Sequence, residues 1–181
     1  MAKWGSVDYK QFKQFSERLN KLSSQEYELF FELCAKELAA RLLAKVIKRT
    51  PVGPNVYENE GGKDILVKNG GTLRRGWTSK SEEEAKSGKE KNAKNWANSL
   101  IVTRKGNLYV IEVVNPVSYA SYVEFGHRQE PGRFVPAIGK RLKISWVEGK
   151  YMLTISEKEL ENIAPRVLEK KLVEYLGECF G

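Results

Sequence analysis

Histidine, cysteine and long apolar runs are all scarce in this chain of 181 residues. It has one histidine, His127, and two cysteines, Cys34 and Cys179, which lie far apart and lack the spacing of metal ligands. A single histidine excludes any site built on paired histidine ligands. The cysteines predict a reducing compartment rather than a disulfide framework. No apolar run reaches the roughly 20 residues of a membrane span, and no signal-peptide core follows the N-terminus. We therefore expect no metal, no cofactor and no membrane contact.

Charge, by contrast, is plentiful and unbalanced. The net charge is +8, the pI is about 9.4, and the hydrophobic and aromatic fractions are 41% and 10%. Such a composition is globular, and a chain of this length can bury a core without metal or disulfide support. We expect a single domain over residues 1–181. The positive charge permits contact with nucleic acid or with an acidic protein surface, although lysines spread over solvated faces would give the same balance.

Two N-terminal segments have helical periodicity. Apolar side chains recur at three- and four-residue steps in residues 8–22, which predicts a short peripheral amphipathic helix. Residues 25–49 lack glycine and proline and are rich in strong helix formers, so we expect one long helix that ends before Pro51. Its apolar residues lie on more than one side. More than one neighbour should therefore bury it: the sheet of its own domain and either the N-terminal helix or another subunit.

The strand-like residues are concentrated in the segment 63–155. Residues 65–67 predict a short strand, and residues 73–77 predict the start of an extended stretch. Apolar alternation around glycine-containing turns predicts one hairpin over residues 100–114 and another over residues 142–155. Residues 78–95 are rich in lysine, glutamate and serine, which predicts a solvated, mobile loop whose helical content is left open.

The last segment with a helical pattern covers residues 156–177. Ser156 and Glu159 have capping-box spacing, and Gly177 is a good C-terminal stop. Pro165 either opens the main helix after a short turn or kinks one continuous helix. The order of elements predicts an α+β fold, with a long N-terminal helix and a C-terminal helix packed on a mostly antiparallel β-sheet.

The stretch 117–137 is dense in residues with restricted roles. Three aromatic residues, Tyr119, Tyr122 and Phe125, are expected to anchor it to the sheet and the long helix, and Phe134 to return the chain to the core. Glu124 either has a raised pKa through burial, pairs with Arg128 or Arg133, or contacts another subunit. His127 opens an exposed tip of residues 127–130 that we expect to meet another protein.

Catalysis is poorly supported by these residues. A hydrolase or nuclease that uses Glu124 and His127 is an alternative, but no serine lies in a nucleophile elbow and neither cysteine has an electropositive niche. We therefore predict a non-enzymatic protein with no catalytic residue.

Nucleic-acid binding is a stronger alternative. Arg74 and Arg75 lie beside Trp77, and the following loop adds several lysines. Basic residues mixed with aromatic ones can bind phosphates and stack on bases. No helix-turn-helix, zinc-finger or RRM signature is present. The runner-up prediction is a small basic nucleic-acid-binding protein, with Arg74 and Arg75 as candidate DNA-facing residues.

Three sequence pieces occur in one order along the chain. The first is Thr-Pro-Val-Gly at residues 50–53, continued after an insertion by Gly-Thr-Leu-Arg-Arg-Gly-Trp at residues 71–77. The second is Tyr-Ala-Ser-Tyr-Val-Glu-Phe-Gly at residues 119–126, and the third is Gly-Arg-Phe-Val-Pro-Ala at residues 132–137. Together they resemble the tail-component or head–tail joining proteins of long-tailed phages and prophages. The chain departs from that pattern by the insertion between Gly53 and Gly71, the charged loop and the extra hairpin at residues 142–155.

The resemblance implies a virion structural protein, made in the bacterial cytoplasm and located at the neck or tail end of the virion. It implies a ring, often six-fold, between the capsid connector and the tail tube. The partners would be copies of itself, a connector or adaptor, and a tail terminator or tail tube. Glu124, His127, Arg128 and Arg133 are the candidate interface residues. A basic ring could also contact DNA in the channel without reading its sequence.

Overall fold

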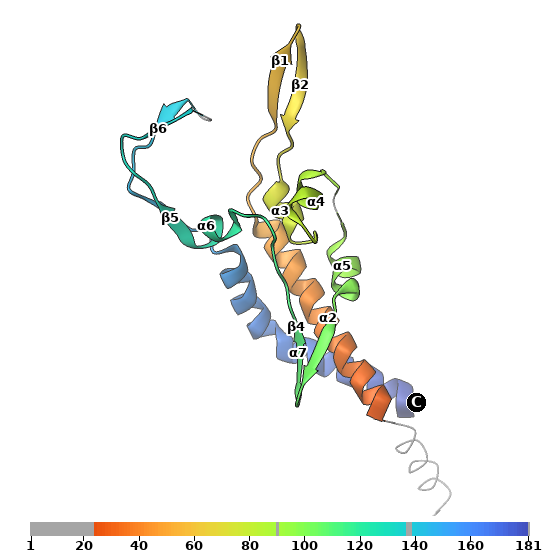
Figure 1. The fold of residues 1–181 in the computed structure, drawn as a ribbon. Coiled ribbons are helices and arrows are strands. Elements are labelled where there is room, and N and C mark those ends of the chain that lie inside the picture. Colours follow the sequence, from red (N-terminus) through yellow and green to blue (C-terminus); the bar gives the residue numbers. More distant parts are fainter. Residues whose placement is uncertain (1–23, 90, 137–138, 181) are drawn as a thin grey trace, which may run out of the picture.

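The computed structural model describes residues 24–89, 91–136 and 139–180. Two long helices, α2 (Ser24–Arg49) and α7 (Met152–Phe180), pack against each other and form the body of the molecule (Figure 1). The predicted helix 8–22 lies outside the described residues. The long helix predicted over residues 25–49 is confirmed, and one of its neighbours is α7.

Helix α2 ends where the sequence predicts it. The Thr50 hydroxyl donates to the carbonyl oxygen of Val46 at 2.6 Å, and Pro51 has no N–H with which to continue the helix. One side of α2 carries Ala39, Leu43 and Val46, which are buried. These three residues form the centre of the hydrophobic core together with buried residues from the later elements: Leu73, Trp77, Ala85, Ala97, Val117 and Met152.

The strands form four separate antiparallel pairs within the described residues. The pairs are β1 (Val56–Glu60) with β2 (Lys63–Lys68), β3 (Val102–Lys105) with β4 (Leu108–Ile111), β5 (Gly126–Arg128) with β8 (Trp146–Glu148), and β6 (Phe134–Val135) with β7 (Lys140–Arg141). The α+β class and the antiparallel pairing are confirmed. The hairpin around Gly106 is also confirmed, although β4 ends at Ile111, whereas the predicted strand reached residue 114.

Four short helices connect these pairs: α3 (Thr72–Gly76), α4 (Glu82–Lys86), α5 (Ala93–Ser99) and α6 (Ala120–Phe125). The extended stretch predicted at residues 73–77 is wrong, because α3 turns these residues so that Leu73 and Trp77 both enter the core. Residues 78–95 contain α4 and the start of α5, and Ala85 is fully buried there. The helical content that the sequence left open is therefore present, and the segment is not solvated throughout, because Ala85 belongs to the core.

The hairpin predicted over residues 142–155 is wrong. Strand β8 pairs with β5, and α7 begins at Met152. The backbone N–H groups of Lys150 and Tyr151 donate to the carbonyl oxygens of Val123 and Glu124, at 2.7 and 3.0 Å. These contacts with α6 redirect the chain into a helix despite its alternating pattern. Ser156 is consequently buried inside α7, where its hydroxyl donates to the Met152 carbonyl oxygen at 2.6 Å instead of capping a helix.

Two parts project from the body (Figure 1). One is the β1–β2 hairpin, which occupies the insertion between Gly53 and Gly71. The other is the arm built from β5, β6, β7 and β8. The predicted return of Phe134 to the core is wrong, because its side chain lies on this arm and is 51% exposed.

Candidate functional site

The residues of the first sequence motif form a buried corner at the end of α2. The indole Nε1 of Trp77 donates to the Thr50 hydroxyl at 2.8 Å, and that hydroxyl donates onward to Val46. Both side chains are buried. This chain of two hydrogen bonds satisfies the polar atoms of the corner, so that Trp77 can bury its ring without an unpaired N–H.

Gly76 and Asn115 join this corner to the second motif. A Cβ on Gly76 would lie 2.1 Å from Oδ1 of Asn115, so any larger residue there would displace the Asn115 side chain. The Asn115 side chain donates to the Leu73 carbonyl oxygen at 2.9 Å and accepts from the Val117 N–H at 3.2 Å. The backbone before α6 is thereby fixed against α3.

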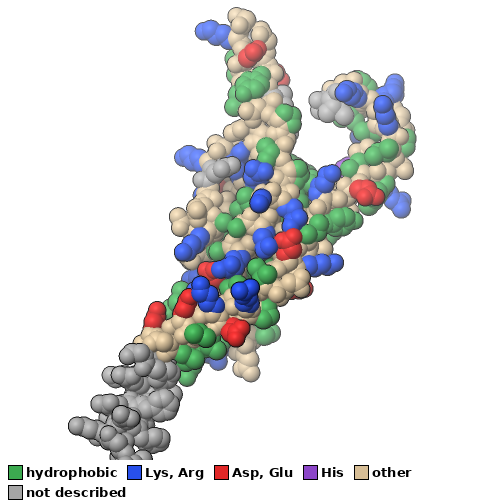
Figure 2. All heavy atoms as spheres, turned by 180° about the vertical axis from the view of Figure 1, so that it is seen from behind, with side chains coloured by type: hydrophobic (Ala, Val, Ile, Leu, Met, Phe, Trp, Pro, Cys, Tyr) green, Lys and Arg blue, Asp and Glu red, His purple; other side chains and the backbone are tan. Residues whose placement is uncertain are grey.

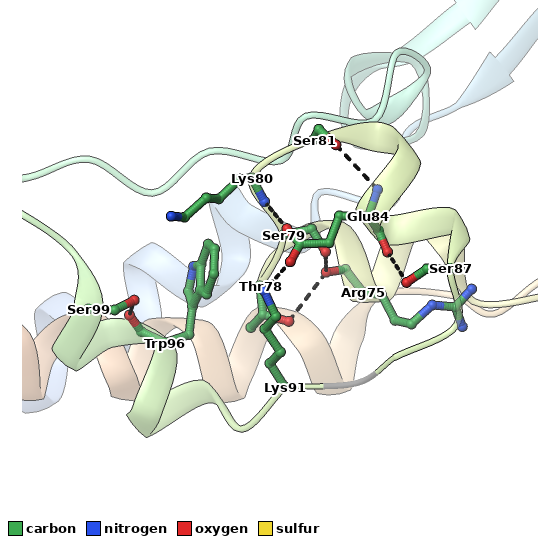
Figure 3. A network of polar contacts seen from close by, with 10 residues as sticks. All are labelled: Arg75, Thr78, Ser79, Lys80, Ser81, Glu84, Ser87, Lys91, Trp96 and Ser99. Carbon is green, nitrogen blue, oxygen red and sulfur yellow. Dashed lines mark hydrogen bonds and ion pairs between the residues drawn. The ribbon is translucent and has the colours of Figure 1, made fainter.

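Arg75 is the centre of a polar network between α3 and α4 (Figure 3). Its guanidinium Nε donates to the Ala85 carbonyl oxygen at 2.8 Å, and Nη1 donates to the Gly70 carbonyl oxygen at 2.7 Å. Its own carbonyl oxygen accepts from the hydroxyls of Thr78 and Ser79. Arg75 is 6% exposed. It therefore holds the loop together, and its guanidinium is directed into the protomer.

Arg74 is also engaged with the protomer. Its Nη2 donates to the Thr50 carbonyl oxygen at 3.3 Å, and its side chain is half-buried. The structure thus gives both candidate DNA-facing arginines a structural role. Arg75 in particular cannot reach a phosphate without leaving its buried position.

The charged loop is organised by capping and ion pairs. The Ser81 hydroxyl accepts from the Glu84 N–H at 3.2 Å, and the Glu84 carboxylate accepts from the Lys80 N–H at 2.6 Å, as in a helix cap. Lys91 forms an ion pair with Glu84 and lies 4.6 Å from the centre of the Trp96 ring (Figure 3). Lys91 and the Lys80 N–H hold the pKa of Glu84 below its ordinary value.

Glu124 caps helix α7. Its carboxylate accepts from the N–H groups of Leu153 and Thr154 at 3.0 and 2.9 Å, and from the Thr154 hydroxyl at 2.8 Å. The residue is 5% exposed. A carboxylate at this position satisfies orphan N–H groups and complements the helix dipole. No ion pair with Arg128 or Arg133 forms among the described residues, so Glu124 is part of the fold and is not available to another subunit.

The other three candidate interface residues lie on the arm. His127 is half-buried on β5, where its ring is 5.7 Å from that of Tyr122 and its Nε2 is 3.2 Å from Nε2 of Gln129. Arg128 and Arg133 are exposed and line one hollow together with His127. Tyr122 and Phe125 are themselves exposed, at 58% and 59%, so the predicted anchoring role holds only for Tyr119, which packs on the core.

Exposed apolar side chains are the feature that motif reading missed. In the described part of the chain, large hydrophobic residues are exposed on the β1–β2 hairpin, on the β3–β4 hairpin, on the arm, in the first half of α2 and in the last third of α7. They include Leu29, Leu33, Tyr57, Ile65, Leu66, Ile101, Leu108, Trp146 and Val173. Scattered single residues would be normal, but several of these residues share one element, which makes these elements candidate contact surfaces. In the sequence, the apolar residues on more than one side of the segment 25–49 were the feature that indicated such surfaces.

Two further properties of the described residues bear on function. They contain no cluster of three or more histidine, cysteine, aspartate or glutamate side chains that could hold a metal ion. In the same ranges, no helix is both long and apolar enough to cross a membrane.

The chain thus has an α+β fold in which residues of the first two sequence motifs hold the connections between elements. The chain belongs to the family described as "Bacteriophage HK97-gp10, putative tail-component", whose model matches residues 13–126. It is thus a phage tail component, with a structural role in the virion. Neither the curated proteins nor the solved structures gave a match. The matched residues end at the start of β5, so that the arm, the third sequence motif and α7 lie beyond them.

Proposed function

We propose that this tail component assembles into a ring at the neck or tail end of the virion, between the capsid connector and the tail tube. The observation that carries the proposal is the amount of apolar surface on projecting elements. A two-stranded hairpin is marginally stable by itself, and both the β1–β2 hairpin and the arm extend from a small core (Figure 1). Both parts would become more stable when a neighbouring copy covers them.

The proposed contacts are heterologous. The hairpin, the arm and the helix ends are different surfaces, and a head-to-tail contact between two different surfaces closes into a ring when the rotation allows it. The hollow lined by His127, Arg128 and Arg133 is a candidate contact with a neighbouring virion protein. Glu124 is not retained, because its carboxylate is fully engaged at the start of α7.

Light scattering and negative-stain electron microscopy test the ring. The purified chain is examined alone and after mixing with connector and tail-tube proteins of its own phage. We expect ring-shaped particles in at least one of these mixtures. A chain that stays monomeric and joins neither partner would contradict the proposal.

Contact with DNA in the channel of such a ring is a second, weaker candidate. Figure 2 shows lysine and arginine side chains gathered over the helical body. Several are exposed on α2 and α7, including Arg41, Lys48, Arg49, Arg166 and Lys170. Binding to duplex DNA should be detectable at about 50 mM salt and should fall steeply as salt rises, as phosphate contacts require. No binding at the low salt concentration would remove this candidate.

A further inference from the structure

The β3–β4 hairpin has large apolar side chains on both of its faces. On the face toward α2, the Tyr109 ring stacks on Phe31 at 5.2 Å and Arg104 forms an ion pair with Glu28. Successive side chains of a strand alternate between faces. Leu108 and Val110 therefore lie on the opposite, outer face.

That outer face is bare in the protomer. Ile101 and Leu108 are 83% and 67% exposed, and Val110 is also exposed. An open groove runs along it toward α5, and its lining includes Trp96, Ile101 and Val110 together with Lys80 and Lys105. A strand with one buried face and one solvated face usually carries polar residues on the solvated face. The apolar outer face therefore indicates that a second layer covers it.

The β1–β2 hairpin has the complementary properties. Tyr57 and Leu66 are register partners on one face, Ile65 lies on the other, and all three are about half exposed. Its residues 56–68 contain Glu58, Glu60 and Asp64 against Lys63 and Lys68, which gives a net charge of −1 in a chain of net charge +8. The groove has two lysines against one acid, Glu112, so its charge is +1.

The two surfaces cannot meet within one chain. Figure 1 shows the β1–β2 hairpin and the β3–β4 turn at opposite ends of the molecule. We infer that the β1–β2 hairpin of one copy packs on the outer face of β3–β4 in the next copy. Leu66 and Asp64 share one hairpin face and would meet Val110 and Lys105. This inference rests on the proposed ring and names the contact that would build it.

Disulfide trapping tests this contact. In a Cys34→Ala, Cys179→Ser background, one chain carries Leu66→Cys and a second, tagged chain carries Val110→Cys. The mixture is oxidised and the heterodimer is quantified. The matched control replaces the second chain by one with Lys158→Cys, an exposed position on α7. Oxidation traps transient encounters, so that a stable ring is not required.

We expect several-fold more heterodimer from the 66/110 mixture than from the control. Lys105→Glu in the second chain should lower the yield, and Asp64→Lys in the first should restore it. Equal yields for the two mixtures would overturn the inference, whatever light scattering shows about rings. A single chain that carries both Leu66→Cys and Val110→Cys should give a ladder of oligomers. If this chain formed only cross-linked dimers, the result would support the contact but contradict the ring.

Discussion

At the scale of single residues, the sequence motifs are explained by buried polar contacts. Thr50, Trp77, Arg75 and Glu124 each satisfy backbone or side-chain groups between elements that are distant in the chain. A buried polar group left without its partner costs more than the hydrogen bond contributes on balance. These positions should therefore be sensitive to substitution although they form no catalytic site.

Glu124→Ala should destabilise the protein by about 1–3 kcal/mol, because two N–H groups at the start of α7 lose their acceptor. Urea unfolding followed by circular dichroism measures the free energy of unfolding. The control is Glu161→Ala, an exposed position on the same helix. Equal stability of the two variants would show that water replaces the carboxylate without loss.

Thr50→Val should cost about 1–3 kcal/mol, since Nε1 of Trp77 would be buried without an acceptor. Thr103→Val is the matched control, because Thr103 is exposed on β3. The change is measured by thermal unfolding, with tryptophan fluorescence as a second readout. A Thr50 variant as stable as the control would mean that the corner relaxes to pair the indole elsewhere.

At the scale of elements, charged side chains stabilise the short helix α4, whereas packing against each other stabilises the long helices α2 and α7. Helix α4 is only five residues long and has Glu82, Glu83 and Glu84 in its first turn, where carboxylates are favoured. Helix α7 is 29 residues long, contains Pro165 and bends along its length (Figure 1). The second alternative for Pro165, one continuous kinked helix, is therefore the correct one.

The protein should lose stability in acid through its paired carboxylates. Lys86 and then the Ser118 N–H lower the pKa of Glu82 from 4.5 to about 2, and Lys45 and Arg49 lower the pKa of Glu159. A carboxyl whose pKa is lower in the folded state stabilises that state above its ordinary pKa, and the contribution disappears as pH falls through the folded value. We expect Tm to fall between about pH 4.5 and pH 2.

Glu82→Gln should make this fall shallower, whereas Glu161→Gln should leave it unchanged. Both are followed by calorimetry at a series of pH values. Identical profiles for the wild type and Glu82→Gln would show that the Glu82 pairings do not persist in solution.

Pro165→Ala should stabilise α7, because proline removes one helical N–H and its ring opposes the carbonyl of the preceding turn, at a cost of about 3 kcal/mol in a helix interior. We expect a higher free energy of unfolding and a larger helical signal in circular dichroism. Arg166→Ala, the next exposed position, serves as control. A less stable Pro165 variant would indicate that the packing of α7 on α2 requires the bend.

At the scale of the whole molecule, the distribution of apolar side chains favours the proposed assembly. Its core is small, while its hairpin, its arm and the outer face of β3–β4 expose large apolar side chains. The insertion relative to the family pattern became one of these projections instead of a disordered loop. Assembly and monomer stability should therefore respond to different residues.

Ile101→Lys should separate the two properties. The residue is 83% exposed, so the free energy of unfolding should change by no more than about 0.5 kcal/mol. Self-association should weaken, because a charge would have to be buried in the proposed groove. Sedimentation velocity measures association, with Lys158→Glu as an exposed control. Unchanged association of the Ile101 variant would place the interface elsewhere.

The α+β class, the long helix after residue 24, the hairpin at Gly106 and the family resemblance all follow from local pattern. Apolar periodicity and the positions of proline and glycine determine the local backbone conformation through residues that are close in the chain. A sequence shows these features directly. The role of Arg75 could not be read in this way, because an arginine beside a tryptophan has the same sequence signature in a phosphate site and in a buried network.

Tertiary contacts determine the parts of the structure that the local pattern predicts wrongly. Residues 151–155 alternate like a strand, yet residues 152–155 are helical. Val123 and Glu124 accept the N–H groups of residues 150, 151, 153 and 154 and thereby fix the start of α7. Likewise, Phe134 has the apolar character of a core residue but lies on a projecting arm. Burial depends on which segments meet in space, and local preference gives way where such contacts satisfy buried polar groups.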